Sequence, residues 1–158
     1  MRTIDTSSAI DFTQKAAEVI ANKINECVGK RGACIIGLSG GSTPQPVYTL
    51  LGQKEIDWSK VSIFLIDERF IPVDHADSNQ KMVRETLLAH ASIPKFNICF
   101  PDTSLVIGTC MQLYTMDLKR QWADHLPDLM ILGMGPDGHI ASLFPPVSDD
   151  LMDDTKLI

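Results

Sequence analysis

The sequence has few of the features that mark secreted, membrane or metal-binding proteins. Its four cysteines include no C-x-x-C pair and no histidines at zinc-ligand spacing, so we expect reduced, mostly buried thiols and no metal site. No apolar run approaches the length of a membrane span, and the first residues lack the apolar core of a signal peptide. The sequence therefore predicts a cytoplasmic protein with no membrane partner.

Positive charge is also scarce. The chain has 14 Lys and Arg residues against 20 Asp and Glu residues, a formal net charge of −6. A sequence-independent nucleic-acid binder needs a basic face that displaces counterions from phosphates, so we expect no nucleic-acid partner. An anionic ligand would need a local source of positive potential. At 158 residues, 44% of them hydrophobic, the chain is typical of a single globular domain.

The apolar residues follow a helical period in some segments and form short continuous runs in others. We predict helices over residues 8–28, 44–52, 79–91 and 105–122. We predict buried strands over residues 33–38, 61–66, 97–100 and 128–132. In the first helix, Phe12 and Val19 belong to the apolar stripe, Ser7 or Ser8 can cap the start, and Gly29 can end it.

Alternation of helices with doubly apolar strands predicts an α/β protein: a Rossmann-like three-layer fold with a mostly parallel sheet and helices on both faces. Parallel strands point the same way, so the segments that follow them meet at one edge of the sheet. These segments are GLSGGSTP (37–44), DERF (67–70) and GMGPDGH (133–139). Ligands bind at this carboxyl edge in open α/β folds.

Two familiar motifs match the glycine turns only in part. Residues 37–41 fit G-x-S-x-G, with Asp67 and His139 in the order of an α/β-hydrolase triad, but three residues separate the serine from the next helix. Residues 133–138 fit G-x-G-x-x-G, yet no strand with an acid follows as a dinucleotide site requires. No Lys follows the first glycines, which excludes a Walker loop.

A phosphate cradle is the plainest interpretation of the first glycine turn. Its glycines let main-chain N–H groups approach an anion, and its hydroxyl groups lie at the mouth of a helix that Pro44 begins. Capping of that helix by Ser or Thr is an equally simple alternative on this turn alone. The predicted substrate-binding residues of the turn are Ser39, Gly40, Gly41, Ser42 and Thr43.

The three motifs together, GLSGGSTP, DERFIPVDHADSN and LGMGPDGHIASLFP, closely resemble those of the 6-phosphogluconolactonase family, which shares its fold with the glucosamine-6-phosphate deaminases. The resemblance implies a phosphosugar-binding lactonase domain over residues 1–146. The implied reaction is hydrolysis of 6-phospho-D-glucono-1,5-lactone to 6-phosphogluconate in the oxidative pentose phosphate pathway, with no cofactor and no metal.

Two details favour the lactonases over the deaminases, which stay an alternative. The second motif reads DER, where the deaminases usually have DEY. The segment after His139 reads ASLFP, where the deaminases have a Glu in an AFNEP-like segment that assists their amine chemistry.

The resemblance and the residue chemistry together suggest roles at the predicted site. His139 is the candidate general base, because imidazole titrates near neutral pH and the family's histidine is held to activate the attacking water. Asp137 can set its tautomer or cap a short helix over residues 140–143. Asp67 can bind substrate hydroxyls, face His139 or pair with Arg69. Arg69 matches the family's phosphate-contacting arginine and supplies local positive charge.

Several neighbours of these residues have simpler predicted roles. Glu68 is expected to point away from the site by strand alternation. Ser78 and Asn79 match the family's SN pair, and capping of the helix that follows explains them equally well. His75, His90 and His125 are expected on the surface.

Family members continue well beyond ASLFP, whereas this sequence follows it with an acidic tail over residues 147–158. We therefore expect a fold that is incomplete at its C-terminus, with an uncovered sheet edge that invites self-association. The small-molecule partner is a phosphosugar lactone. A phosphosugar-binding module without catalysis is the second hypothesis.

Overall fold

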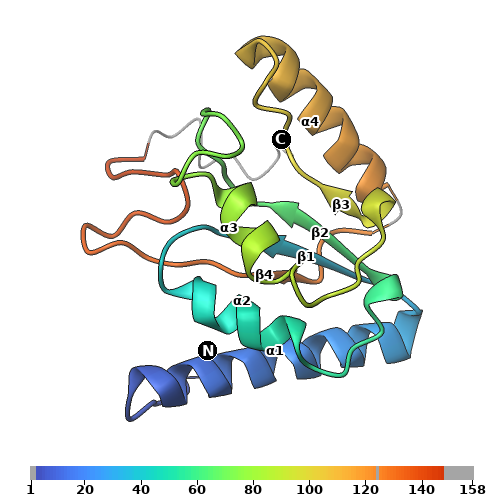
Figure 1. Ribbon diagram of the computed structural model, residues 1–158, viewed down its shortest axis with the longest axis vertical. Coiled ribbons are helices and arrows are strands. Elements are labelled where there is room, and N and C mark those ends of the chain that lie inside the picture. The colour runs from blue at the N-terminus through green and yellow to red at the C-terminus, as the bar shows by residue number, and fades with distance from the viewer. Residues whose placement is uncertain (1–2, 124, 148–158) are drawn as a thin grey trace.

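A four-stranded parallel sheet forms the centre of the computed structural model, which describes residues 3–123 and 125–147 (Figure 1). The strands are β1 (Cys34–Leu38), β2 (Val61–Leu65), β3 (Ile98–Cys99) and β4 (Leu129–Met130). Their spatial order is β3-β2-β1-β4, and every neighbouring pair is parallel. The predicted parallel sheet is confirmed.

Helices cover both faces of the sheet, as predicted (Figure 1). One face carries α1 (Ala9–Arg31), α2 (Pro44–Gly52) and α3 (Asn79–Glu85), and the other carries α4 (Ile107–Gln121). Two short 3₁₀ helices, η1 (Trp58–Lys60) and η2 (Lys95–Asn97), lead into β2 and β3. Within the described ranges, none of these helices has the length and apolar composition needed to cross a membrane.

Strand alternation explains why β1 is buried along its whole length. Cys34, Ile36 and Leu38 point into the larger core, with α1, α2 and α3, while Ile35 joins Phe64 under α4. Each fully buried large apolar side chain contributes about 1.5–3 kcal/mol to stability. A strand buried on both faces therefore reads as a continuous apolar run, which is the pattern that predicted it.

The helix boundaries follow the sequence signals with two corrections. Ser8 caps α1, since its Oγ accepts a hydrogen bond from the main-chain N–H of Asp11 at 3.1 Å. Gly32, not Gly29, ends the helix, because only Gly32 adopts the left-handed conformation, at φ 78°. The third helix ends at Glu85 instead of 91, and turns follow it.

The predicted apolar stripe of α1, which also included Ala9, is wrong at three positions, and Ala9 is exposed. Phe12 and Val19 are exposed, whereas Ala17, Ile20 and Ile24 are buried. Spacings of three and four leave the direction of the stripe uncertain by one residue, and packing against α2 and β1 decides it.

The outer edge of β4 has no partner strand among the described residues. Met130, Leu132 and Met134 are exposed along and after this strand. The expectation of an uncovered edge therefore agrees with the described part of the chain, and self-association through it stays a prediction. Of the acidic tail predicted over residues 147–158, all but residue 147 lies outside the described residues.

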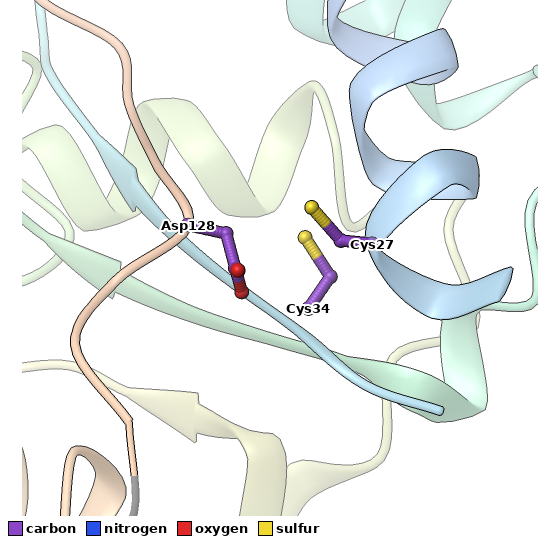
Figure 2. A group of neighbouring side chains, drawn as sticks. All are labelled: Cys27, Cys34 and Asp128. Atoms are coloured by element: carbon purple, nitrogen blue, oxygen red, sulfur yellow. The ribbon is translucent and has the colours of Figure 1, made fainter. Parts of the chain in front are cut away.

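Asp128 ties the start of β4 to α1 and β1. Its Oδ2 accepts hydrogen bonds from Arg31 Nη2 at 2.5 Å and from the main-chain N–H of Ile35 at 2.8 Å. Figure 2 shows the Cys27 and Cys34 side chains near it. The two Sγ atoms and a carboxylate oxygen of Asp128 lie within 4.8 Å of one another. Burial, with the nearby Cys27 and Asp128, raises the pKa of Cys34 to about 12. A protonated thiol and a carboxylate already paired with Arg31 make this a structural tie.

Replacing Asp128 with Asn should lower the free energy of unfolding by about 1–3 kcal/mol at pH 7. Burial raises the pKa of Asp128, but the hydrogen bonds from Arg31 and Ile35 outweigh burial and leave it below its usual value. The stabilisation is therefore present above pH about 4 and is lost as the pH falls through the folded-state pKa. Urea unfolding of both proteins from pH 7 to pH 3 checks this. A difference that stays constant over this range would contradict it.

Candidate active site

The loops that follow β1, β2 and β4 leave the sheet at its carboxyl edge (Figure 1). Residues of these loops line one open cleft of about 420 Å³. The loop after β1 and the start of α2 supply residues 39–44. Asp67 and Arg69 come from the loop after β2, and His139 comes from the loop after β4. Segments a hundred residues apart in sequence thus surround one cavity.

The first loop presents hydroxyl and main-chain groups to the cleft. Gly41 adopts φ 102°, which favours glycine, and Pro44 occupies the first turn of α2. Thr43 occupies the N-cap position but makes no side-chain capping hydrogen bond. The main-chain oxygen of buried Ser39 accepts a hydrogen bond from Tyr48 Oη at 3.0 Å, which fixes the start of the loop. The capping alternative therefore does not account for the Thr43 hydroxyl.

Arg69 is held at the cleft by neutral acceptors. Its Nη1 donates to Asn79 Oδ1 and to the main-chain oxygen of Asp77 at 3.3 Å. The alternative of an ion pair with Asp67 is wrong, since no ion pair within residues 3–123 and 125–147 involves Arg69. Its positive charge is thus not neutralised by a described carboxylate.

Asp67 reaches across to the third loop instead. Its Oδ2 accepts a hydrogen bond from Ser142 Oγ at 2.8 Å. The two loops that carry Asp67 and His139 are therefore linked directly, although no hydrogen bond joins these two side chains within the described ranges. Ser142 is a contact that the sequence did not single out.

Glu68 has a structural role that sequence reasoning missed. Its carboxylate accepts hydrogen bonds from the main-chain N–H groups of Asn79 at 2.7 Å and Gln80 at 2.8 Å. An acid at this position satisfies N–H groups that the first turn of a helix leaves unpaired. Ser78 caps the same helix through Lys81 N, as its alternative reading held. Glu68 does not line the cleft, which agrees with the expected direction.

His139 forms a close pair with Asp137. The Nδ1 atom lies 2.5 Å from Asp137 Oδ1, and this hydrogen bond lowers the pKa of Asp137. An ionised carboxylate can only accept, so Nδ1 is the donor in this pair, and in the neutral form of the ring Nε2 carries the lone pair. The ring also packs on Phe144, with centroids 4.7 Å apart. The short helix suggested over residues 140–143 is wrong, because this segment consists of turns and isolated bridges.

Two glycines shape the turn around this histidine. Gly138 adopts φ 86°, and Gly135 donates its main-chain N–H to the main-chain oxygen of His139 at 2.8 Å. A Cβ atom at Gly135 would lie 2.2 Å from His139 Cε1 and 2.7 Å from Asp137 Oδ1. Only glycine therefore allows the pair to occupy this place.

The remaining histidines lie elsewhere. His75, His90 and His125 are exposed and do not line the cleft. A larger cavity of about 860 Å³ lies beside the second loop, but its lining is mainly apolar and includes Phe70, Val73 and Phe100. The lining of this larger cavity contains neither a histidine nor a glycine turn.

Comparison with known proteins identifies the family. The family described as "Glucosamine-6-phosphate isomerases/6-phosphogluconolactonase" matches residues 7–158. The chain belongs to this family. It is 38% identical over 151 residues to the probable 6-phosphogluconolactonase of Dictyostelium discoideum, covering 93% of this chain and 64% of that protein. It is 38% identical over 135 residues to the 6-phosphogluconolactonase of Thermotoga maritima, covering 85% of this chain and 59% of that protein.

Solved structures of the family share the fold. The structure of the Thermotoga maritima 6-phosphogluconolactonase matches with a TM-score of 0.80 at 37% identity, over 84% of this chain and 60% of that one. The Plasmodium vivax 6-phosphogluconolactonase matches with a TM-score of 0.82 at 38% identity, over 89% and 50%. The chain thus spans 64% or less of the length of these relatives.

Replacing Gly135 with Ala should break the Asp137–His139 hydrogen bond, because the new Cβ needs the space of the imidazole ring. The matched control is Gly133→Ala in the same loop, where a Cβ meets nothing within 4 Å. Long-range proton–nitrogen NMR correlations of the imidazole should show protonated Nδ1 in the parent and control proteins and a mixture of tautomers in Gly135→Ala. The same tautomer in all three would contradict the prediction.

Proposed function

We propose that this chain hydrolyses 6-phospho-D-glucono-1,5-lactone to 6-phosphogluconate, a reaction of the oxidative pentose phosphate pathway. The observation that carries the proposal is the shared cleft, in which a glycine turn and Arg69 lie with the His139 imidazole. The names of the similar proteins support the same reaction.

The 6-phosphate binds at the glycine turn and Arg69. Main-chain N–H groups of Gly40 and Gly41, the start of α2 and the Ser42 and Thr43 hydroxyls supply neutral donors. Arg69 supplies the full positive charge that a chain of net charge −6 must place locally. A planar guanidinium held by neutral acceptors keeps its charge for the phosphate oxygens.

His139 activates the water. While Nδ1 donates a hydrogen bond to Asp137, Nε2 takes a proton from a water molecule, and the oxygen of this water attacks C1 of the lactone. The bond between C1 and the ring oxygen then breaks, and protonated His139 returns the proton to that oxygen. Main-chain N–H groups of the glycine turns stabilise the negative charge that develops on the carbonyl oxygen. Asp67, whose Oδ2 accepts a hydrogen bond from Ser142 Oγ, binds substrate hydroxyls.

The proposed reaction needs no metal. A positioned general base accelerates a reaction by roughly 10²- to 10⁴-fold, which suffices for an ester as labile as this lactone. Treatment with a chelator should therefore leave turnover unchanged.

A second candidate is a phosphosugar-binding module without catalysis. It is favoured by the fact that Arg69 is held by Asp77 and Asn79, so the proposed phosphate contacts of this arginine do not involve His139. Lactone hydrolysis measured against the spontaneous rate, followed by calorimetric titration with 6-phosphogluconate, separates the two. Binding without stimulated hydrolysis would favour the module. Release of ammonia from glucosamine 6-phosphate would instead favour the deaminase alternative.

Replacing His139 with Ala should reduce the stimulated hydrolysis of the lactone by roughly 10²- to 10⁴-fold. The affinity for 6-phosphogluconate should change little, because the phosphate is held by the first two loops. The control is His90→Ala, at an exposed position outside the cleft. Turnover by His139→Ala equal to that of the parent chain would show that another group is the base.

Replacing Arg69 with Gln should raise the Kd for 6-phosphogluconate by about tenfold or more, the loss expected when a charge-assisted hydrogen bond is removed. The matched control is Arg120→Gln on α4, whose exposed side chain pairs with Asp117 and does not line the cleft. Isothermal calorimetry measures both. An unchanged Kd for Arg69→Gln would move the phosphate site away from this arginine.

A further inference from the structure

The side chain of Asn79 lies between the two parts of the proposed phosphate site. Asn79 begins α3 and is only 1% exposed, although it contributes to the cleft lining. Its Nδ2 donates to the main-chain oxygen of Asp67 at 2.9 Å, and its Oδ1 accepts from Arg69 Nη1. The same amide group thus holds the end of β2 and the guanidinium.

The glycine turn rests on the other side of that amide group. A Cβ atom at Gly40 would lie 1.8, 2.3 and 2.7 Å from Asn79 Oδ1, Cγ and Nδ2. All three nearest atoms belong to the Asn79 amide, so this side chain occupies the space that a Cβ atom would need. Gly40, unlike Gly41, does not have a positive φ. The demand for glycine at position 40 therefore comes from packing.

The main chain of Asn79 is also fixed. Glu68 Oε1 accepts its N–H at 2.7 Å, and Glu68 Oε2 accepts from Gln80 N at 2.8 Å and from Ser78 Oγ at 3.2 Å. Glu68 is the neighbour of Arg69 in sequence. These hydrogen bonds therefore fasten the loop that carries the guanidinium to the start of α3, which carries Asn79. Buried polar groups with full sets of partners hold one geometry.

We infer that Asn79 is a positioning residue, which sets the place and orientation of Arg69 relative to the glycine turn. It acts on the substrate through Arg69 and Gly40, and the inference rests on the proposed function. Phosphate oxygens must meet donors from both elements at once, and a displacement of about 1 Å between such groups can cost roughly 10²-fold in rate. The separation of the two elements therefore controls affinity for the 6-phosphate.

A double-mutant cycle tests the contact and its effect on binding. Gly40→Ala should lower the midpoint of thermal unfolding by at least about 3 °C and weaken 6-phosphogluconate binding by about tenfold, because the new Cβ displaces the amide. In an Asn79→Ala background the obstructing atoms are gone, so adding Gly40→Ala should cost less than half as much stability. Gly108→Ala, in α4 with no atom within 4 Å of its Cβ, is the control.

Asn79→Asp gives a second measurement in which the side-chain shape is kept. The new side chain can no longer donate a hydrogen bond to the main-chain oxygen of Asp67, and its carboxylate pairs with the Arg69 guanidinium. The Kd for 6-phosphogluconate should therefore rise by about tenfold or more while the protein stays folded. A purely structural role for Asn79 would change thermal stability and leave the Kd of the folded protein unaltered.

The outcomes separate the inference from the proposed function. Additive losses of stability in the cycle would overturn the packing contact and the inference with it. A parent chain that binds 6-phosphogluconate, with both Asn79 variants binding equally well, would overturn only the inference. A parent chain that neither binds 6-phosphogluconate nor stimulates lactone hydrolysis would overturn the proposed function and the inference that rests on it.

Discussion

Parallel pairing of β1 with both of its neighbours is the constraint on which the site depends. Ile36 is in register with Ile63 of β2 on one side and with Leu129 of β4 on the other. Because all three strands run the same way, their following loops leave at one edge. Burial of β1 on both faces fixes this register, since a slip of one residue would exchange the residues of the two cores. The core thus determines which loops meet.

Two physical reasons for glycine operate in this cleft. Gly41 and Gly138 have positive φ, so the backbone itself favours glycine there. Gly40 and Gly135 instead leave space for a side chain from elsewhere: the Asn79 amide in one case and the His139 ring in the other. Each glycine of the second kind lets its turn pack directly against a side chain of the site. Both ends of the cleft, where an anion and a base are proposed, are built in this way.

The sequence predicted the sheet and the shared edge well, because both follow from local patterns. Continuous apolar runs gave the strands, and Pro44 and Gly52 gave the bounds of α2. Errors arose where two local signals compete. Gly29 and Gly32 are both possible helix ends, and only the chain direction after the helix selects the second.

Contacts that depend on loop closure were not predictable in this way. Glu68 and Asn79 are eleven residues apart, and their hydrogen bond exists only because the loop returns to the end of β2. The Asp67–Arg69 pair, one of the alternatives for Asp67, is absent for the same reason, since Asn79 holds Arg69 and Ser142 holds Asp67. The sequence indicated that Ser78 could cap the start of α3, but it did not indicate where the side-chain amide of Asn79 points.

The central claim is that one ligand engages the glycine turn and the imidazole together. Titration of the isotope-labelled chain with 6-phosphogluconate, followed by NMR, tests it most directly. The account predicts that the amide signals of Gly40 and Gly41 and the imidazole signals of His139 shift with the same saturation curve. Shifts confined to one of the two groups, or saturation at different concentrations, would contradict it.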